Sequence, residues 1–203
     1  MSLPKLGAPR IVCNGPAKRR GVICALSVAA ALGSSAGTVT AKDFLDIRAR
    51  DQCDAATFNA GRATPLCNAA RGGSVTLAEF QAAVPNGGHG AWKFNPGPSG
   101  GHLDFGGVVQ VTSDAGETHT LTRVNAFGGG FVPPLNVAVG NAPTTPECAE
   151  MAAGGLHATA NGIIVTSPSA QVFSAGNSTQ FPRGIHLYQC CIHPWMRTII
   201  TVR

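Results

Sequence analysis

The most informative stretch of this 203-residue sequence is Tyr188-Gln189-Cys190-Cys191-Ile192-His193-Pro194-Trp195-Met196. Cys190, His193 and Met196 recur every third residue, and a short loop after a strand can turn all three side chains toward one point. A thiolate, an imidazole and a thioether are soft ligands, which suit copper far better than magnesium or calcium and leave zinc as the chemical competitor. The stretch therefore predicts a metal-binding loop.

A copper site that serves both oxidation states needs two imidazoles and one thiolate near a plane, with a weak axial sulfur. The second imidazole must come from outside the loop. We expect it from His119, which opens the strand 119–122 directly after the turn 113–117. The other histidines have no ligand spacing: His89, His102, His157 and His186.

Two adjacent cysteines compete for the role of ligand. Side chains alternate along a strand, so Tyr188 and Cys190 face one way while Gln189 and Cys191 face the other. The polar Gln189 indicates that its own face is the outer one. We therefore predict that Cys190 is the ligand and that Cys191 points away from the metal.

Working outward from the loop, residues 91–203 show short, β-branched strands separated by Gly, Pro, Asn and Ser. We expect strands at 108–112, 119–124, 163–166, 171–173 and 199–202, a pattern that favours an antiparallel sandwich or barrel. Residues 128–155 are predicted to be a long insertion, with a helical turn at 146–153 carrying Cys148. Segment 42–90 predicts a short helix near its start and a second one capped by Thr76 and Glu79.

Composition agrees with a sheet protein, because only 12% of residues are charged, 44% are hydrophobic, and the chain holds 26 Gly and 14 Pro. The formal net charge of +5 is confined to residues 1–41, which carry five bases and no acid. Residues 42–203 balance ten bases against ten acids. A basic surface for nucleic acid is therefore excluded.

The charged start of the chain predicts export. Lys18-Arg19-Arg20 precedes an apolar stretch over 21–37 and small residues before Ala41, which is typical of a cleaved signal peptide over 1–41. A twin-arginine signal is the minority interpretation, and an uncleaved anchor is the alternative. We expect a periplasmic or secreted protein with no membrane span after cleavage.

Export changes how the five remaining cysteines are interpreted, since thiols pair in an oxidising compartment. Cys53 and Cys67 are close in sequence and form the first expected disulfide. Cys148 and Cys191 form the second, which leaves Cys190 as the free thiolate. The second bridge would tie the long insertion to the metal loop.

Cys190-x-x-His193-Pro194-x-Met196 near the end of the chain resembles the copper loop of the cupredoxins, and its short spacing looks most like that of amicyanins rather than plastocyanins. The strand and acidic turn before His119 likewise resemble the family's strand that bears the first histidine ligand. The resemblance covers about 91–203. It implies a Greek-key β-sandwich, with 42–90 as a helix-containing extension, and one type 1 copper ion bound by His119, Cys190, His193 and Met196.

This ligand set predicts a function without catalysis. Four protein ligands leave no open position for a substrate, so we expect a one-electron carrier and not an enzyme. The ring edge of His193 is expected to reach solvent, with Pro194 and Trp195 as an apolar patch for brief docking of a redox partner. The alternatives are a protein that stores, delivers or senses copper, and a structural module whose cysteines all pair.

Overall fold

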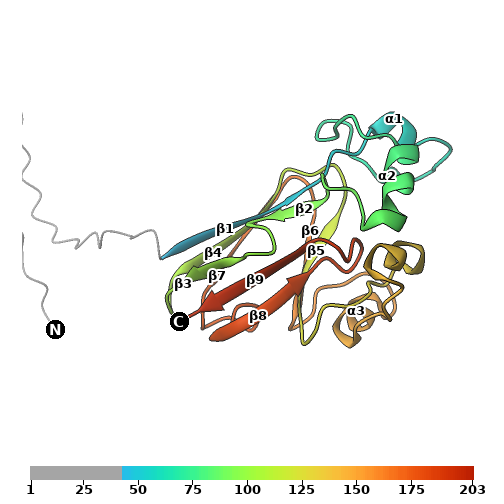
Figure 1. Cartoon of the computed structure of the whole chain (residues 1–203). Coiled ribbons are helices and arrows are strands. Elements are labelled where there is room, and N and C mark those ends of the chain that lie inside the picture. Colours follow the sequence, from blue (N-terminus) through green and yellow to red (C-terminus); the bar gives the residue numbers. More distant parts are fainter. Residues whose placement is uncertain (1–42) are drawn as a thin grey trace, which may run out of the picture. The chain divides into compact units, whose positions relative to one another are not determined.

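The computed structural model describes residues 43–203, which form two β-sheets packed face to face (Figure 1). The first sheet has the order β2-β1-β4-β7, with strands at Lys93–Asn95, Phe44–Arg50, Val108–Ser113 and Ser169–Ser174. The second has the order β3-β9-β8-β5-β6, with strands at Gly101–Leu103, Arg197–Val202, Gly184–Gln189, His119–Val124 and Gly162–Val165. This arrangement confirms the expected β-sandwich.

The chain crosses between the sheets after β2, β3, β4, β6 and β7. An antiparallel arrangement was expected, but two strand pairs are parallel: β1 with β4, and β3 with β9. The five strands expected from sequence are present within two residues of their predicted bounds. Each parallel pair contains one strand, β1 or β3, that the sequence pattern did not reveal. An all-antiparallel sandwich was expected for this reason.

The first strand corrects the expected boundary between an extension and the sandwich. The short helix expected near the start of 42–90 is instead β1, which lies between β2 and β4 in the first sheet. Its burial alternates, with Ile47 and Ala49 completely buried, because a half-buried strand places every second side chain in the core. The segment expected as an extension therefore supplies part of the sandwich.

The core lies between the two sheets. Alternate side chains of both inner faces meet there and are almost completely removed from solvent, which contributes about 1.5–3 kcal/mol for each large apolar side chain. The buried members from the strands include Ile47, Phe94, Leu103, Val109, Val111, Leu121, Tyr188, Ile200 and Val202.

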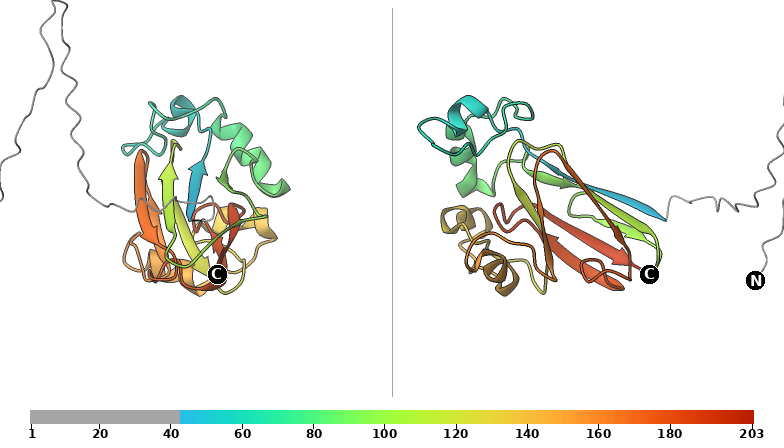
Figure 2. Two further views of the ribbon diagram at one scale, coloured as in Figure 1. Left: turned by 90° about the vertical axis from the view of Figure 1, so that its left-hand side faces the viewer. Right: turned by 180° about the vertical axis from the view of Figure 1, so that it is seen from behind.

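Short helices gather at one end of the sandwich, away from the C-terminus of the chain (Figures 1 and 2). They are α1 (Ala55–Phe58), α2 (Leu77–Ala83), η1 (Val84–Asn86), η2 (Pro133–Val139) and α3 (Pro146–Ala152). The predicted capping box of α2 is confirmed, since the Glu79 amide donates to Thr76 Oγ1 and the Glu79 carboxylate accepts from the Thr76 amide. The predicted helical turn that carries Cys148 is α3.

Two disulfides hold the loops at this end, and both were expected. Cys53 is bonded to Cys67, and Cys148 is bonded to Cys191. Gly116 lies against the Cys53–Cys67 bridge so closely that a Cβ there would collide with both sulfurs. Cys190 is the free cysteine of the described residues.

The predicted signal peptide over 1–41 lies outside the described residues. Within the part of the chain that the structure describes, no helix is both long enough and apolar enough to cross a bilayer.

Candidate metal centre

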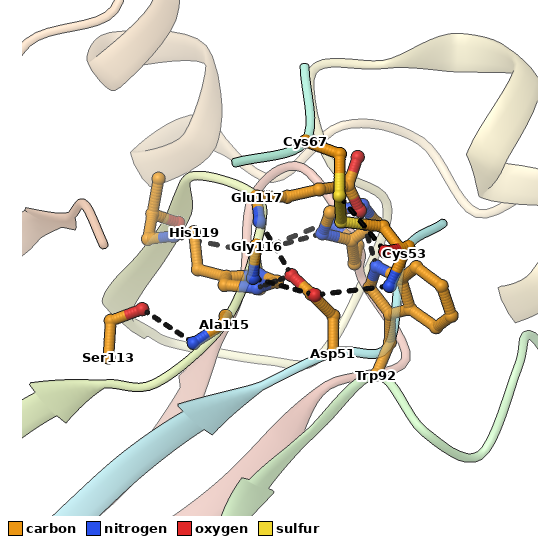
Figure 3. A network of polar contacts seen from close by, with 12 residues as sticks. Asp51, Cys53, Cys67, Trp92, Ser113, Ala115, Gly116, Glu117 and His119 are labelled. Carbon is orange, nitrogen blue, oxygen red and sulfur yellow. Dashed lines mark hydrogen bonds and ion pairs between the residues drawn. A yellow bond between two sulfur atoms is a disulfide. The ribbon is translucent and has the colours of Figure 1, made fainter. Parts of the chain in front are cut away.

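His119 stands at the point where the chain passes from the first sheet to the second. β4 ends at Ser113, the turn 114–118 follows, and His119 opens β5 with its side chain completely buried. The ring points into the end of the sandwich that the helices cover (Figure 3). The strand pairing fixes the backbone of His119, because this residue lies opposite Val165 of β6.

The predicted metal loop connects β8 to β9 and is closed by its own backbone. The Cys190 amide donates to the Met196 carbonyl at 3.0 Å, and the Met196 amide donates to the His193 carbonyl at 2.9 Å. Cys190, His193 and Met196 are all buried. These two backbone hydrogen bonds close the loop around its buried side chains.

Three side chains that sequence analysis selected converge on one point. Cys190 Sγ lies 3.9 Å from His119 Nδ1 and 3.8 Å from His193 Nδ1, and the three potential ligand atoms lie within 4.8 Å of one another. A point equidistant from atoms so spaced is about 2.5 Å from each, close to the ~2.0–2.3 Å of metal bonds to nitrogen and sulfur. The three side chains thus form a pocket of the size of a metal ion.

The surroundings of Cys190 favour the thiolate. Burial by itself raises the pKa of this thiol, but hydrogen bonds with His119 and His193 outweigh burial and hold the pKa well below its ordinary value. The backbone amides of Thr120 and His193 also donate to Cys190 Sγ, each at 3.4 Å. A thiolate, rather than a thiol, is the form that binds metal.

Asp51 holds the outer edge of the His119 ring. His119 Nε2 lies 2.9 Å from Asp51 Oδ2, and both side chains are completely buried. Burial alone lowers the pKa of His119, but the bonds to Asp51 and Cys190 outweigh it and raise the pKa to about 9. Burial raises the pKa of Asp51, and the His119 bond and backbone donors reverse this, so the pKa falls below its usual value.

The position of Asp51 follows from strand pairing. It directly follows β1, whose parallel pairing with β4 aligns Ala49 with Ser113, so Asp51 reaches the turn after β4. There its carboxylate accepts from the amides of Gly116 and Glu117, both at 2.8 Å (Figure 3). A carboxylate on the outer nitrogen of a ligand histidine fixes the ring and its tautomer.

Glu117 takes the corresponding position beside His193. Glu117 Oε2 lies 3.5 Å from His193 Nε2 and accepts a hydrogen bond of 2.6 Å from Trp92 Nε1. Burial raises the pKa of Glu117 above its ordinary value. Both imidazoles therefore direct Nδ1 toward Cys190 and Nε2 toward a carboxylate.

His193 is shielded, and this corrects the expected solvent-exposed ring edge. The residue is 2% exposed, and the rings of Phe80 and Trp195 pack against it edge-on. Pro194 is also buried, and Trp195 is half-buried under Gly88. Within the expected docking patch, His193 and Pro194 are therefore buried and Trp195 is partly exposed, and Phe80 and Gly88 of segment 51–92 pack against the loop.

The two adjacent cysteines point in the directions that were expected, but the stated reason was wrong, and the role of Cys190 as ligand stays a prediction. Cys190 faces His119, whereas Cys191 faces away and is bonded to Cys148. Gln189, however, does not mark an exposed face, because it is completely buried beneath the insertion. Its amide oxygen accepts from the Gly128 amide at 3.0 Å. The 128–155 insertion thus covers the face that was expected to be exposed.

Sequence analysis missed Asp51 and Glu117. Glu117 had a local signal, since it lies two residues before a predicted ligand on the same turn. Asp51 is 68 residues from His119 and had none. Met196 lies buried at the end of the loop as expected, and the role of its thioether as a fourth ligand stays a prediction.

No protein-family model and no curated protein matches the chain. Among solved structures it is similar to a purple cupredoxin from Nitrosopumilus maritimus, with 16% identity, 57% of this chain and 86% of that chain covered, and a TM-score of 0.33. It is also similar to a mutant amicyanin in its Cu(I) form, with 14% identity, 55% of this chain and 73% of that chain covered, and a TM-score of 0.31. For the oxidized plastocyanin from Dryopteris crassirhizoma the identity is 15%, the coverage is 57% of this chain and 91% of that chain, and the TM-score is 0.26. Likeness at this level carries no argument about ligands or function.

The fold is instead assigned from the sheets and the loop. Two mixed sheets enclose one core, a buried histidine opens β5, and a Cys-x-x-His-x-x-Met loop joins β8 to β9 at the same end. The sandwich, the buried histidine and the loop are features that the sequence resemblance implied, and the parallel pairs that make the sheets mixed are not. The described part of the chain is a cupredoxin-like β-sandwich.

Proposed function

We propose that this protein binds one copper ion of type 1 and acts as a one-electron carrier between redox partners. The observation that carries the proposal is the convergence of His119, Cys190 and His193 on one buried point. Two imidazoles and a thiolate form the donor set that suits copper in both oxidation states, and Met196 would add the weak fourth sulfur. When bound, the ion would supply one-electron chemistry between the cuprous and cupric states.

The residues around the site fit a carrier better than a catalyst. All four proposed ligands are buried, and the loop that bears three of them is closed by backbone hydrogen bonds. The hydrogen bond that His119 donates to Asp51 fixes the ring of His119, and ring packing fixes His193. A rigid donor set that barely moves between the two oxidation states suits electron transfer, and we propose no catalytic residue.

His193 is the proposed route for the electron, although its ring does not reach solvent directly. The residue borders a groove of about 410 Å³ whose walls are largely apolar, with Phe80, Leu135 and Ile192 among them. A small apolar surface suits a brief encounter with a redox partner. The proposed docking region is therefore this groove in place of the buried Pro194.

Two features support an exported carrier. The disulfides Cys53–Cys67 and Cys148–Cys191 require an oxidising compartment to persist. The basic and apolar pattern of residues 1–41 is that of an export signal. We propose a periplasmic or secreted location, with the signal removed.

An absorption spectrum of the purified protein with cupric ion tests the proposal. We expect an intense visible band from the Cys190 thiolate, bleached by ascorbate and restored by an oxidant. His157→Gly serves as a control, because His157 is exposed and remote in sequence from the loop. Colourless binding of cuprous ion alone would overturn the carrier and favour copper storage or delivery. Binding of zinc with no stable cupric form would overturn the copper assignment.

A further inference from the structure

We infer that Glu117, oriented by Trp92, is a positioning residue for His193 and lowers the reduction potential of the site. The inference rests on the copper carrier proposed above. It assigns a function to a carboxylate outside the ligand set and to segment 51–92, which covers the loop.

The outer edge of His193 has a defined neighbour. Its Nδ1 faces Cys190, and its Nε2 lies 3.5 Å from Glu117 Oε2. The His193 side chain is 3% exposed and that of Glu117 is 12% exposed, so bulk water has little access to the gap. The 3.5 Å separation is that of an ion pair and is longer than an ordinary hydrogen bond, so the Glu117 carboxylate acts on the ring through its negative charge.

The carboxylate is itself held in place. Trp92 Nε1 donates to Glu117 Oε2 at 2.6 Å, and the Trp92 ring is buried between Phe58 and Phe80, with centroid distances of 5.9 and 4.7 Å. Trp92 precedes β2, which pairs antiparallel with β1 in a register that places Lys93 opposite Arg50. Trp92 therefore lies at the end of the sheet from which Asp51 reaches His119 (Figure 3).

This geometry has an electrostatic consequence. A carboxylate 3.5 Å from the outer nitrogen polarises that N–H and makes the imidazole a stronger electron donor to a metal on the inner nitrogen. Glu117 also adds a third anionic group to a buried site that already contains the Cys190 thiolate and the Asp51 carboxylate. Adding an electron to such a site is unfavourable where the dielectric constant is low. The cupric state is therefore stabilised relative to the cuprous state, and the reduction potential falls.

The negative charge of Glu117 can be removed while the size and shape of its side chain are kept. Glu117→Gln keeps an oxygen to accept from Trp92, and Phe80 and Trp195 still pack against the His193 ring. Asp114→Asn is the matched control, because Asp114 is an exposed carboxylate on the same turn that pairs with Arg48 at 3.2 Å instead of a ligand. Glu117→Asp keeps the charge and shortens the side chain by one methylene.

The test is a redox titration of the full-length copper-loaded protein and its variants. We expect Glu117→Gln to keep the visible band and to shift the midpoint potential upward. Asp114→Asn should keep the wild-type potential. The potential of Glu117→Asp should lie between those of the wild-type protein and Glu117→Gln. In the diamagnetic cuprous form, the His193 Nε2 proton is expected to move upfield in Glu117→Gln, because the negative charge beside that N–H is removed. Urea unfolding of each metal-free variant checks that the fold is intact.

The outcomes separate the two proposals. Absence of a visible band in the wild-type protein overturns the copper carrier and this inference with it. A wild-type band together with an unchanged potential in Glu117→Gln, or an equal shift in Asp114→Asn, overturns the role of Glu117 alone. Loss of the band in a folded Glu117→Gln protein would assign Glu117 to metal binding and overturn its role in tuning.

Discussion

Removal of the Cys148–Cys191 disulfide tests how the metal loop is held. The bridge joins α3 to the residue next to Cys190 and closes a loop with a sequence separation of 43. We consider the double variant Cys148→Ala with Cys191→Ala, because alanine places no new hydroxyl in a completely buried site. The expected result is a less stable protein that still binds copper with its visible band.

The size of the effect follows from chain entropy. Cross-linking over 43 residues removes unfolded-state entropy worth about 4 kcal/mol at 25 °C, whereas the Cys53–Cys67 bridge, with a separation of 14, removes about 3 kcal/mol. The double variant should therefore lose more unfolding free energy than the matched double variant of Cys53 and Cys67. The band should persist, because the Cys190 amide still closes the loop onto Met196.

Urea unfolding of the metal-free proteins measures the free energies, and an absorption spectrum with cupric ion measures the site. A loss below about 1 kcal/mol would show that the bridge does not constrain the unfolded chain as supposed. Loss of the visible band in a folded double variant would refute the claim that the backbone shapes the loop. A larger loss from the Cys53–Cys67 variant would refute the entropic ordering.

Three further predictions concern the site itself. Cys190→Ser should abolish the visible copper band while Cys191→Ser keeps it, and the reverse result in the spectra of the two variants would move the ligand to Cys191. His119→Gly should lose the visible band and regain it when imidazole is added, as measured by absorption, whereas the control His102→Gly should bind copper normally. A native spectrum for His119→Gly without added imidazole would exclude His119 as a ligand. Asp51→Asn should weaken copper affinity by about 10–100-fold in a competition titration with a chelator, because the outer nitrogen of His119 loses its carboxylate, and unchanged affinity would show that Asp51 does not support the ligand.

The local parts of the site were predictable from sequence because they depend on spacing. Cys190, His193 and Met196 lie within one short loop, and strand alternation separates Cys190 from Cys191. His119 could be selected because an acidic turn followed by a strand is also a local pattern. The two disulfides could be predicted once export was inferred, because Cys53 and Cys67 are close in sequence and the assignment of Cys190 to the metal left Cys148 and Cys191 to pair.

The surroundings of the ligands depend on contacts between distant segments, for which no local pattern exists. Asp51 reaches His119 only because β1 pairs in parallel with β4, a non-local pairing that the residues of neither strand specify. Gln189 has a polar side chain typical of an exposed face, yet the 128–155 insertion covers it and satisfies its amide. His193 is buried because Phe80 of α2 packs against it, so exposure at the metal site was decided by how the chain returns over its own loop.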